Sequence, residues 1–527
     1  MQFRDTFVAM RCTSSGTFRY CTGDPADLCI YTHRGPLVRR IDQVKSSIIR
    51  VGALALAASA GVFSAACDSD DSTGPVANPV VLSNRSVTPA LVKSLVSGVE
   101  IFTLVGSDDV LPNSPSFIFG GSADGTGLIR NANGTFTALV NHEDNYAVSR
   151  ITLDSTFKPV SGEYVVNSTF GKYRLCSATL ATVAEHGFGP LFITAGESNE
   201  ESQVLGVNPF GAVNTPTYLT GFGRWNTENA VPLPKTAYAG KTIILLGDDD
   251  SGAEGGQLVM YVANTVGDLD NGKLYAMART NDATRERDMV VGQSYPVAFR
   301  ELANHKTLTG RQLNLATVGV KAMAFGRVED IDYRKDGIGR EAYFTVTGQN
   351  NTGVNADYSR AKYGRVYKIT LDAADPLKGN LEVILDGDDR NGPAKLFQNP
   401  DNIFVATNYV YVQEDDNGYG DETHDGYVYQ YNISTKELKP VLQLDHRRTA
   451  SDAAKYNAVG GRPEGKAGWE YGAMIDVSEQ TGSASTFMLS LQPHSWQATK
   501  YQAADGGTVR PAEQQASQLV IVKGLPR

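Results

Sequence analysis

Short runs rich in apolar and β-branched residues recur along this chain, separated by turns rich in Gly, Asn and Asp. Residues 136–140 and 242–246 are two such runs, and each leads into an acidic turn. Val, Ile, Thr and aromatic residues favour the pleated, half-buried surface of a β-sheet. Short runs bounded by turn residues therefore predict many β-strands joined by tight connections.

Several of these runs share the pattern Gly-x-hydrophobic-Tyr, at residues 272–278, 364–370 and 426–432. Two of them are followed by a polar turn and a second apolar run, at 381–385 and 438–442. Strand pairs of this kind are typical of propeller blades, and their irregular spacing indicates insertions.

We therefore predict an all-β fold, an elaborated β-propeller with insertions. Two β-sandwiches or a β-helix are the alternatives, and the lack of a fixed short period disfavours the β-helix. Near-helical spacing of apolar residues predicts one helical patch at 89–99.

The N-terminal region has the pattern of an export signal. Basic residues precede an apolar run at 51–63, which is too short to span a bilayer comfortably. Small residues then lead to Cys67 and a polar tether, as in a bacterial lipoprotein signal, so we expect lipidation of Cys67 and export to the cell envelope or periplasm. An ordinary cleaved signal with a chance cysteine is the alternative. We assign 1–43 to an extension from a start codon placed too early, 44–66 to the signal, 67–85 to the tether and 86–527 to the propeller.

Composition narrows the possible functions. The net charge is -10 and no basic stripe is visible, which argues against a nucleic-acid partner. Three of the five cysteines lie in the predicted extension, so Cys176 is the one cysteine beyond Cys67. A disulfide framework is then excluded, and we expect the core to supply the stability.

Five acidic motifs lie next to predicted strands. Carboxylates at strand ends around one rim can converge on a hard cation, and an arginine among them can clamp a phosphate with its planar fork. Plain polar turns are the alternative reading of each motif taken alone. The motifs are Asn141-His142-Glu143, Gly223-Arg224-Trp225-Asn226-Thr227-Glu228, Gly247-Asp248-Asp249, Gly326-Arg327-Val328-Glu329 and Asn399-Pro400-Asp401-Asn402.

The order and spacing of these motifs resemble those of the PhoX-type alkaline phosphatases, over most of residues 100–495. Gly223-Arg224-Trp225 with Glu228 is similar to the family's Gly-Arg-Phe-x-His-Glu, and Leu246-Gly247-Asp248-Asp249 to its Gly-Asp-Asp. Gly326-Arg327-Val328-Glu329 is similar to its Arg-Pro-Glu, and Pro400-Asp401-Asn402 to its Pro-Asp-Asn.

The resemblance implies a propeller whose mouth holds calcium and iron ions, carboxylate ligands and an arginine that binds phosphate. Arg327 would be the phosphate arginine. It lies two residues before Glu329, so in an extended strand both side chains would point to one face. The implied metal ligands are Glu143, Glu197, Glu228, Glu329, Asp401 and Asp415.

The chain also departs from the family pattern. The segment that resembles Trp-Leu-Thr-Cys-Glu-Glu carries Ala195 and Gly196 where the cysteine is expected. Cys176 lies earlier in the chain, near the position of a different family cysteine, and a small buried apolar residue is the alternative reading of it. We therefore expect at least one calcium ion and little or no iron.

From these observations we predict an exported, calcium-dependent phosphatase acting on a small phosphate ester. Metal ions would bind the phosphate oxygens, and Arg327 would neutralise charge that grows in the transition state. We expect a monomer that contacts the membrane only through its lipid anchor. A non-catalytic surface propeller that binds a ligand or partner and a calcium-dependent lactonase or esterase are the alternatives.

Overall fold

The computed structural model describes residues 79–458, 468–509 and 513–527. The predicted extension and signal, Cys67 and most of the tether lie outside these residues. The described part is almost entirely β, and its strands form the blades of a propeller, which confirms the predicted fold class. None of its helices is long and apolar enough to cross a membrane.

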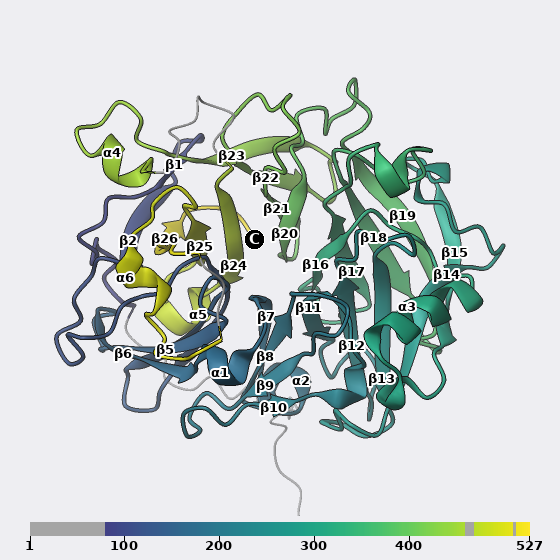
Figure 1. Cartoon of the computed structure of the whole chain (residues 1–527), viewed down its shortest axis with the longest axis horizontal. Coiled ribbons are helices and arrows are strands. Elements are labelled where there is room, and N and C mark those ends of the chain that lie inside the picture. The colour runs from purple at the N-terminus through teal and green to yellow at the C-terminus, as the bar shows by residue number, and fades with distance from the viewer. Residues whose placement is uncertain (1–78, 459–467, 510–512) are drawn as a thin grey trace, which may run out of the picture. The chain divides into compact units, whose positions relative to one another are not determined.

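Six strands in the described residues form an inner ring (Figure 1). Each packs against the next along the chain, and the last packs against the first, which closes the ring. The inner strands are β3 (Ala123–Arg130), β7 (Leu175–Ala181), β11 (Thr227–Pro232), β16 (Val328–Tyr333), β20 (Pro400–Val405) and β24 (Glu470–Asp476).

Each inner strand starts a blade of antiparallel strands that runs outward. The first two blades continue with β4 (Phe136–His142), β5 (Ala147–Leu153) and β6 (Pro159–Val166), and with β8 (Leu191–Gly196), β9 (Leu205–Val207) and β10 (Thr217–Tyr218). The third and fourth continue with β12 (Thr242–Asp248), β13 (Gln257–Ala263), β14 (Lys273–Arg279) and β15 (Ser294–Glu301), and with β17 (Glu341–Val346), β18 (Arg365–Leu371) and β19 (Lys378–Asp386). The last two continue with β21 (Tyr409–Glu414), β22 (Tyr427–Asn432), β23 (Leu438–Leu444) and β1 (Val92–Ser94), and with β25 (Thr486–Gln492), β26 (Gln518–Lys523) and β2 (Glu100–Gly106).

Two pairings hold the ring together. Strand β2 pairs with β26, so segments from both ends of the described chain share the last blade. Strand β15 pairs with β19, which joins the third and fourth blades at their outer edges into one nine-stranded sheet. Each inner strand is an edge strand of its sheet, and the closed ring packs these short edges against one another, which protects them.

The helices are short and lie in the connections. They are α1 (Ser168–Gly171), α2 (Val183–His186), α3 (Gly310–Gly319), α4 (Ala453–Tyr456), α5 (Ser478–Thr481) and α6 (Thr499–Gln502), with 3-10 turns η1 (Thr220–Phe222), η2 (Glu286–Asp288), η3 (His305–Thr307) and η4 (Gly353–Asn355). Helix α3 starts with a capping box, because Thr309 accepts from the Gln312 amide and Gln312 accepts from the Thr309 amide.

The predicted strand pairs at 364–385 and 426–442 are confirmed as β18–β19 and β22–β23. The predicted helical patch at 89–99 is wrong. Its middle forms β1, whose Val92 lies opposite Leu444 on the edge of the fifth blade, and Leu91 is fully buried. Pairing with an available sheet edge has overridden the local spacing of apolar residues.

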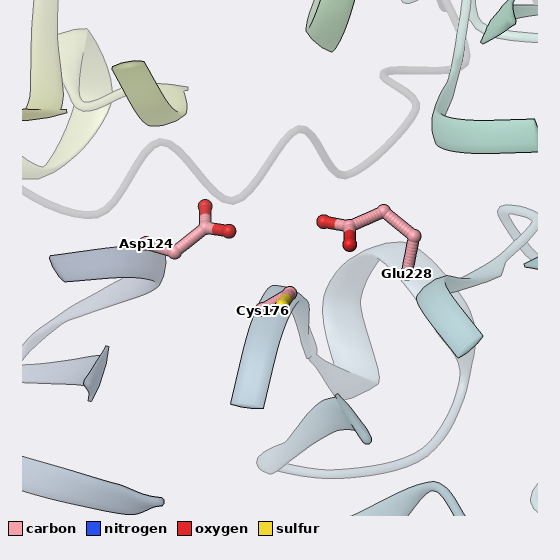
Figure 2. Close-up of side chains that lie close together, drawn as sticks. All are labelled: Asp124, Cys176 and Glu228. Carbon is pink, nitrogen blue, oxygen red and sulfur yellow. The ribbon is translucent and has the colours of Figure 1, made fainter. Parts of the chain in front are cut away.

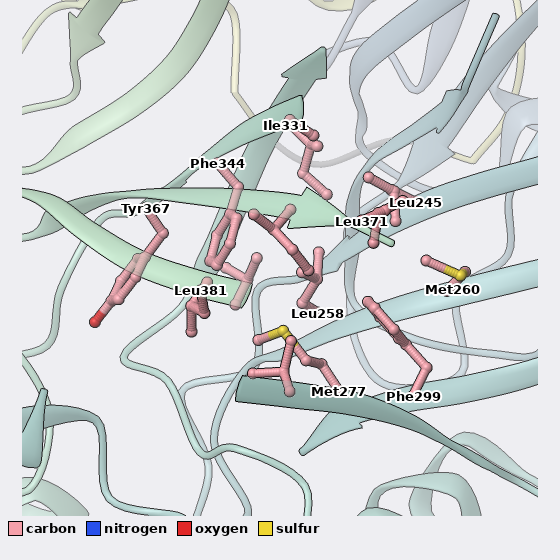
Figure 3. Close-up of a cluster of buried hydrophobic side chains, with 14 of the residues drawn as sticks. Leu245, Leu258, Met260, Met277, Phe299, Ile331, Phe344, Tyr367, Leu371 and Leu381 are labelled. Atoms are coloured by element: carbon pink, nitrogen blue, oxygen red, sulfur yellow. The ribbon is translucent and has the colours of Figure 1, made fainter. Parts of the chain in front are cut away.

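Apolar side chains fill the space between blades. The core of the nine-stranded sheet brings Leu245 and Met260 of the third blade against Ile331 and Phe344 of the fourth (Figure 3). The rings of Phe344 and Tyr367 stack with centroids 5.0 Å apart. This packing fixes the angle between the two blades that carry Glu228 and Glu329.

Candidate active site

A cavity of about 760 Å³ opens where the inner strands begin. Its walls are mostly carboxylates, with a few cationic and amide side chains. All seven residues predicted from the sequence line it, namely Glu143, Glu197, Glu228, Arg327, Glu329, Asp401 and Asp415. The sequence analysis did not assign Asp124, Arg174, Cys176, Asn226, Glu470 and His494, which also line it.

The first set of site residues lies at an irregularity that recurs in the inner strands. In β3, β7, β11, β16 and β20 the register shifts just after the first residue of the strand. A bulge bends its strand and redirects a side chain, and bulges are common beside active sites. The residues at this position are Asp124, Cys176, Glu228, Glu329 and Asp401.

Strand β24 has the same irregularity, but the residue there is Gly472. A Cβ atom on Gly472 would lie 2.6 Å from the carbonyl oxygen of Ala123 and 2.9 Å from an oxygen of Asp124. The absence of a side chain at Gly472 therefore leaves room for Asp124. The carboxylate of the sixth blade is Glu470, at the start of β24 and not at the bulge.

A second set of residues follows the second strand of a blade. Glu143 follows β4, Glu197 follows β8, Asp249 follows β12 and Asp415 follows β21. Because neighbouring blades are related by rotation about the ring, equivalent positions face the same axis. The site thus comes from repetition of one local arrangement.

Arg327 directly precedes β16 and belongs to a third set, with Arg174 before β7 and Asn226 before β11. Its Nε and Nη2 atoms donate to the two oxygens of Asp249, at 2.7 and 3.1 Å, and Nη1 donates to Asn417 Oδ1 at 2.9 Å. Burial by itself would lower the pKa of Arg327, but Asp249 and Glu329 raise it well above its usual value. The guanidinium is therefore charged under all working conditions.

The predicted closeness of Arg327 and Glu329 is correct, but the geometric reason was wrong. Nη2 of Arg327 lies 2.9 Å from Oε1 of Glu329. Arg327 has a φ of 73°, so it is left-handed and not extended. A non-glycine residue in this region is strained, and such strain persists where surrounding contacts fix it, often at functional sites.

Three groups of side chains have ligand atoms within 4.8 Å of one another. Asp401, Asp415 and Glu470 offer only oxygen. Cys176 belongs to both other groups, one with Asp124 and Glu228 and one with Glu143 and Glu197. Figure 2 shows Asp124, Cys176 and Glu228 pointing toward a common point from three neighbouring blades.

Cys176 is buried, as its sequence interpretation expected, and it also lines the cavity. Its Sγ donates to Glu197 Oε2 at 3.1 Å. Burial, followed by the charges of Glu143 and Glu228, raises the pKa of the thiol well above its usual value. The family cysteine sought in the segment around Gly196 is absent there, but a thiol reaches the same cavity from β7.

The electrostatics of the cavity favour cations. Burial is the main cause that raises the pKa values of Glu197, Glu228, Asp401 and Glu470 well above the usual range, and neighbouring carboxylates add to it. Burying several like charges together is costly unless they neutralise by binding protons or metal ions. Oδ1 of Asp401 is buried and has no hydrogen-bond partner among the described residues.

A polar layer supports the site below the bulges. Asn402 donates from Nδ2 to Ser177 Oγ at 2.8 Å and to Asp124 Oδ1 at 3.5 Å. Asp330 accepts from the Ile403 amide at 3.0 Å and from Asn229. Burial raises the pKa of Asp330 to about 7. These contacts link five of the six inner strands directly beneath the candidate ligands.

Comparison with known proteins is consistent with this geometry. The sequence model of the family described as alkaline phosphatase PhoX matches residues 162–461. No curated protein matches the chain. A solved structure of Pseudomonas fluorescens PhoX in complex with vanadate, a transition state analogue, is 13% identical, with 84% of this chain and 97% of that chain covered and a TM-score of 0.56.

Other solved structures are similar at a lower level. A mutant α-L-arabinofuranosidase from Fusarium graminearum in complex with an iminosugar inhibitor is 10% identical, with 80% of this chain and 98% of that chain covered and a TM-score of 0.38. A hypothetical selenium-binding protein from Sulfolobus tokodaii is 11% identical, with 70% and 69% covered and a TM-score of 0.33.

Proposed function

Because this chain belongs to the alkaline phosphatase PhoX family, a family of phosphoric ester hydrolases, we propose that it hydrolyses small phosphate esters in the acidic cavity with calcium bound there. One observation carries the proposal. Arg327 is held by Asp249 among carboxylates that gather from all six blades. An anionic substrate enters such a cavity only when cations outweigh the carboxylates, and Arg327 then offers its planar fork to a phosphate.

The chain's own residues fit metal ions of two kinds. Asp401, Asp415 and Glu470 form an all-oxygen group, which suits a hard cation such as calcium. The two groups that share Cys176 combine one thiolate with carboxylates, which suits a softer transition metal. We propose calcium at the first group and a transition metal, with iron as the leading candidate, at Cys176. The expectation of little or no iron rested on a cysteine missing from the segment around Gly196, and the thiol of Cys176 offers a ligand of that kind in the cavity.

Bound metal ions would bind phosphate oxygens and stabilise the negative charge that develops in phosphoryl transfer. Arg327 would donate to the phosphate and stabilise the same charge from the protein side. Asp249 holds the guanidinium plane in place, so little reorganisation is needed when the substrate arrives. The cavity volume of about 760 Å³ accommodates a small ester rather than a polymer.

A three-substrate assay tests the proposal against its alternatives. Metal-replete protein is given an aryl phosphate, an aryl carboxyl ester and a lactone. We expect turnover of the phosphate alone, loss of activity on chelation and recovery when calcium is restored. Turnover of the ester or lactone instead would indicate the second enzyme class. Inactivity toward all three with metal bound would favour a binding protein.

We also propose that the protein is exported and held at the cell envelope by acyl groups on Cys67, and that it acts as a monomer. The small residues before Cys67 and the polar tether after it support this. Cys67→Ser should move the protein from the membrane fraction to the soluble fraction while activity is kept. Unchanged fractionation of this variant would contradict lipidation, and a larger species in light scattering would contradict the monomer.

A further inference from the structure

Asp248 ends strand β12 next to Asp249, but it is not a wall of the phosphate cavity. Successive side chains of a strand point to opposite faces, so Asp248 shares a face with Leu246. Leu246 packs in the apolar cluster that contains Leu313 of helix α3. Asp248 is 1% exposed, and neither of its carboxylate oxygens has a hydrogen-bond partner among the described residues.

Two more carboxylates approach this place from other segments. Asp250 follows β12, and Glu200 lies in the loop after β8. Asn314 of α3 links them, because its Nδ2 donates to Asp250 Oδ2 at 2.8 Å and to Glu200 Oε2 at 3.3 Å. Asn314 is itself 1% exposed, and its Oδ1 has no partner in the described structure.

A fifth side chain with an available oxygen is that of Gln257 on β13. Gln257 lies directly opposite Asp248 in the antiparallel register, so both side chains point to the same face. Gln257 is 2% exposed, and its Oε1 is also without a partner among the described residues. Three buried side chains from three elements thus carry oxygens that no donor in the described part of the chain satisfies, which is uncommon in folded proteins.

The equivalent residue of the fifth blade, Glu414, is a buried carboxylate that does have hydrogen-bond donors. Glu414 ends β21 as Asp248 ends β12, and it is fully buried. It accepts from the amides of Gln398 and Tyr427, both at 2.8 Å, and its Oε2 lies 2.9 Å from His424 Nε2. The fifth blade therefore supplies donors to its buried carboxylate.

The carboxylate of Asp248, in contrast, has no hydrogen-bond donor among the described residues. Burial raises its pKa well above the usual range, and Asp250, Asp249 and Glu200 raise it further. The Asn226 amide lowers it, but this amide does not meet either oxygen with hydrogen-bond geometry. Two arginines lie near these acids: Arg311 is paired with Glu254 at 2.7 Å, and Arg360 donates to the carbonyl oxygens of Gly252 and Ala253.

We propose that Asp248, Asp250 and Glu200, with the side-chain oxygens of Asn314 and Gln257, bind a calcium ion beneath α3, separate from the phosphate cavity. Calcium takes six to eight oxygen ligands from carboxylates, amides and water in flexible geometry. Rotation of the Asn314 amide by half a turn would bring Oδ1 to the place of Nδ2, between the two carboxylates. The ion would fasten α3 and the loop after β8 to the strand end that carries Asp249.

Calcium stoichiometry and thermal unfolding test this site without reference to activity. Asp248→Asn keeps the shape and removes the charge, and it should lower bound calcium by about one ion per chain as measured by mass spectrometry. It should also reduce the rise in Tm that calcium produces. Glu254→Gln, on the same loop but outside the ligand set, is the matched control and should keep the full calcium count. Glu470→Gln should remove a different ion, so its loss should add to that of Asp248→Asn.

A second variant keeps the test decisive if Asp248→Asn folds poorly. Asn314→Asp places one more carboxylate in the site. With calcium bound it should be as stable as the wild type, and in chelator it should be clearly less stable. The proposal is overturned if Asp248→Asn keeps every calcium ion and melts higher than the wild type, which is the behaviour of a protonated carboxyl replaced by an amide. It is also overturned if Asn314→Asp is destabilised equally with and without calcium.

Discussion

Arg327 and Asp249 meet edge to edge, with Nε 2.7 Å from Oδ1 and Nη2 3.1 Å from Oδ2. Asp249 is the only carboxylate in the described site that uses both oxygens on this guanidinium, and its side chain is 5% exposed. A two-pronged pair fixes the plane of the guanidinium as well as its position. Asp249, directly after β12, therefore sets the orientation in which Arg327, directly before β16, faces the cavity.

The first prediction concerns this positioning role. Asp249→Asn keeps one acceptor but loses the charged, two-pronged pair, so Arg327 should lose its fixed orientation. We expect kcat on an aryl phosphate to fall about ten- to a hundredfold, the scale of a misplaced catalytic group. Metal content should not change, and KM should change less than kcat. Loss of metal in this variant would show that Asp249 acts as a ligand instead.

The second prediction concerns the thiol. Cys176→Ser replaces the soft ligand shared by two of the candidate metal groups. Transition-metal content should fall to a small fraction of the wild-type value, while calcium at the Asp401 group should persist. Mass spectrometry of both metals in protein loaded under identical conditions provides the measurement. An unchanged iron content would remove Cys176 from the ligand set.

The third prediction concerns pH. The pKa values of Asp401 and Glu470 are raised by burial and then by Asp415, so protons compete with calcium at this group. Calcium affinity should fall as pH falls through the raised pKa values, about tenfold per pH unit for each proton displaced. Calorimetric titration at pH 6 and pH 8 should give a much weaker site at pH 6. Equal affinities at the two pH values would contradict the assignment.

The raised pKa values of Asp401 and Glu470 also predict how the folding stability of the metal-free protein changes with pH. A carboxyl whose pKa is raised in the folded state holds a proton that the unfolded chain has released. Metal-free protein should therefore be most stable at low pH and lose stability as pH rises through the raised values. Added calcium should oppose this loss, since it replaces the protons.

The fourth prediction concerns the packing that joins the third and fourth blades. Phe344 is fully buried, stacks on Tyr367 and meets Phe325 edge-on with centroids 5.6 Å apart. Phe344→Ala leaves a cavity and should cost about 3–5 kcal/mol of unfolding free energy. Urea unfolding monitored by tryptophan fluorescence would measure it. A cost below about 1 kcal/mol would mean that the two blades pack less tightly than their contacts indicate.

Most strands and the class of the fold were predictable, because turn residues punctuate runs such as 364–370 and 426–432. The carboxylates in acidic turns were also visible as motifs. What the sequence concealed was how they converge. Asp124 and Cys176 reach the cavity because each lies at a bulge, and a bulge depends on pairing with a partner strand, not on local residue preferences.

Two errors have the same physical origin. Glu470 was missed because its blade carries Gly472 at the bulge, so the acid occupies an unexpected place. Residues 89–99 were assigned to a helix because their spacing allowed one, whereas the open edge of the fifth blade takes 92–94 as a strand. A signal for Asp124 and Cys176 did exist, since aligning the other five inner strands on their first residue places both in one column with Glu228, Glu329 and Asp401.

The central claim is that Arg327 stabilises a transition state at phosphorus in this cavity, and steady-state kinetics on an aryl phosphate tests it most directly. Wild type, Arg327→Ala, Arg327→Lys and the control Arg224→Ala are compared at equal, verified metal content. Arg224 is half-buried and is not among the residues that line the cavity, so its variant should keep the full rate. We predict that Arg327→Ala lowers kcat about a hundred- to a thousandfold and that Arg327→Lys stays impaired, because an ammonium cannot reproduce the two-pronged contact. A metal-loaded wild type that does not hydrolyse the phosphate, or an Arg327→Ala variant that keeps the wild-type rate, would contradict the claim.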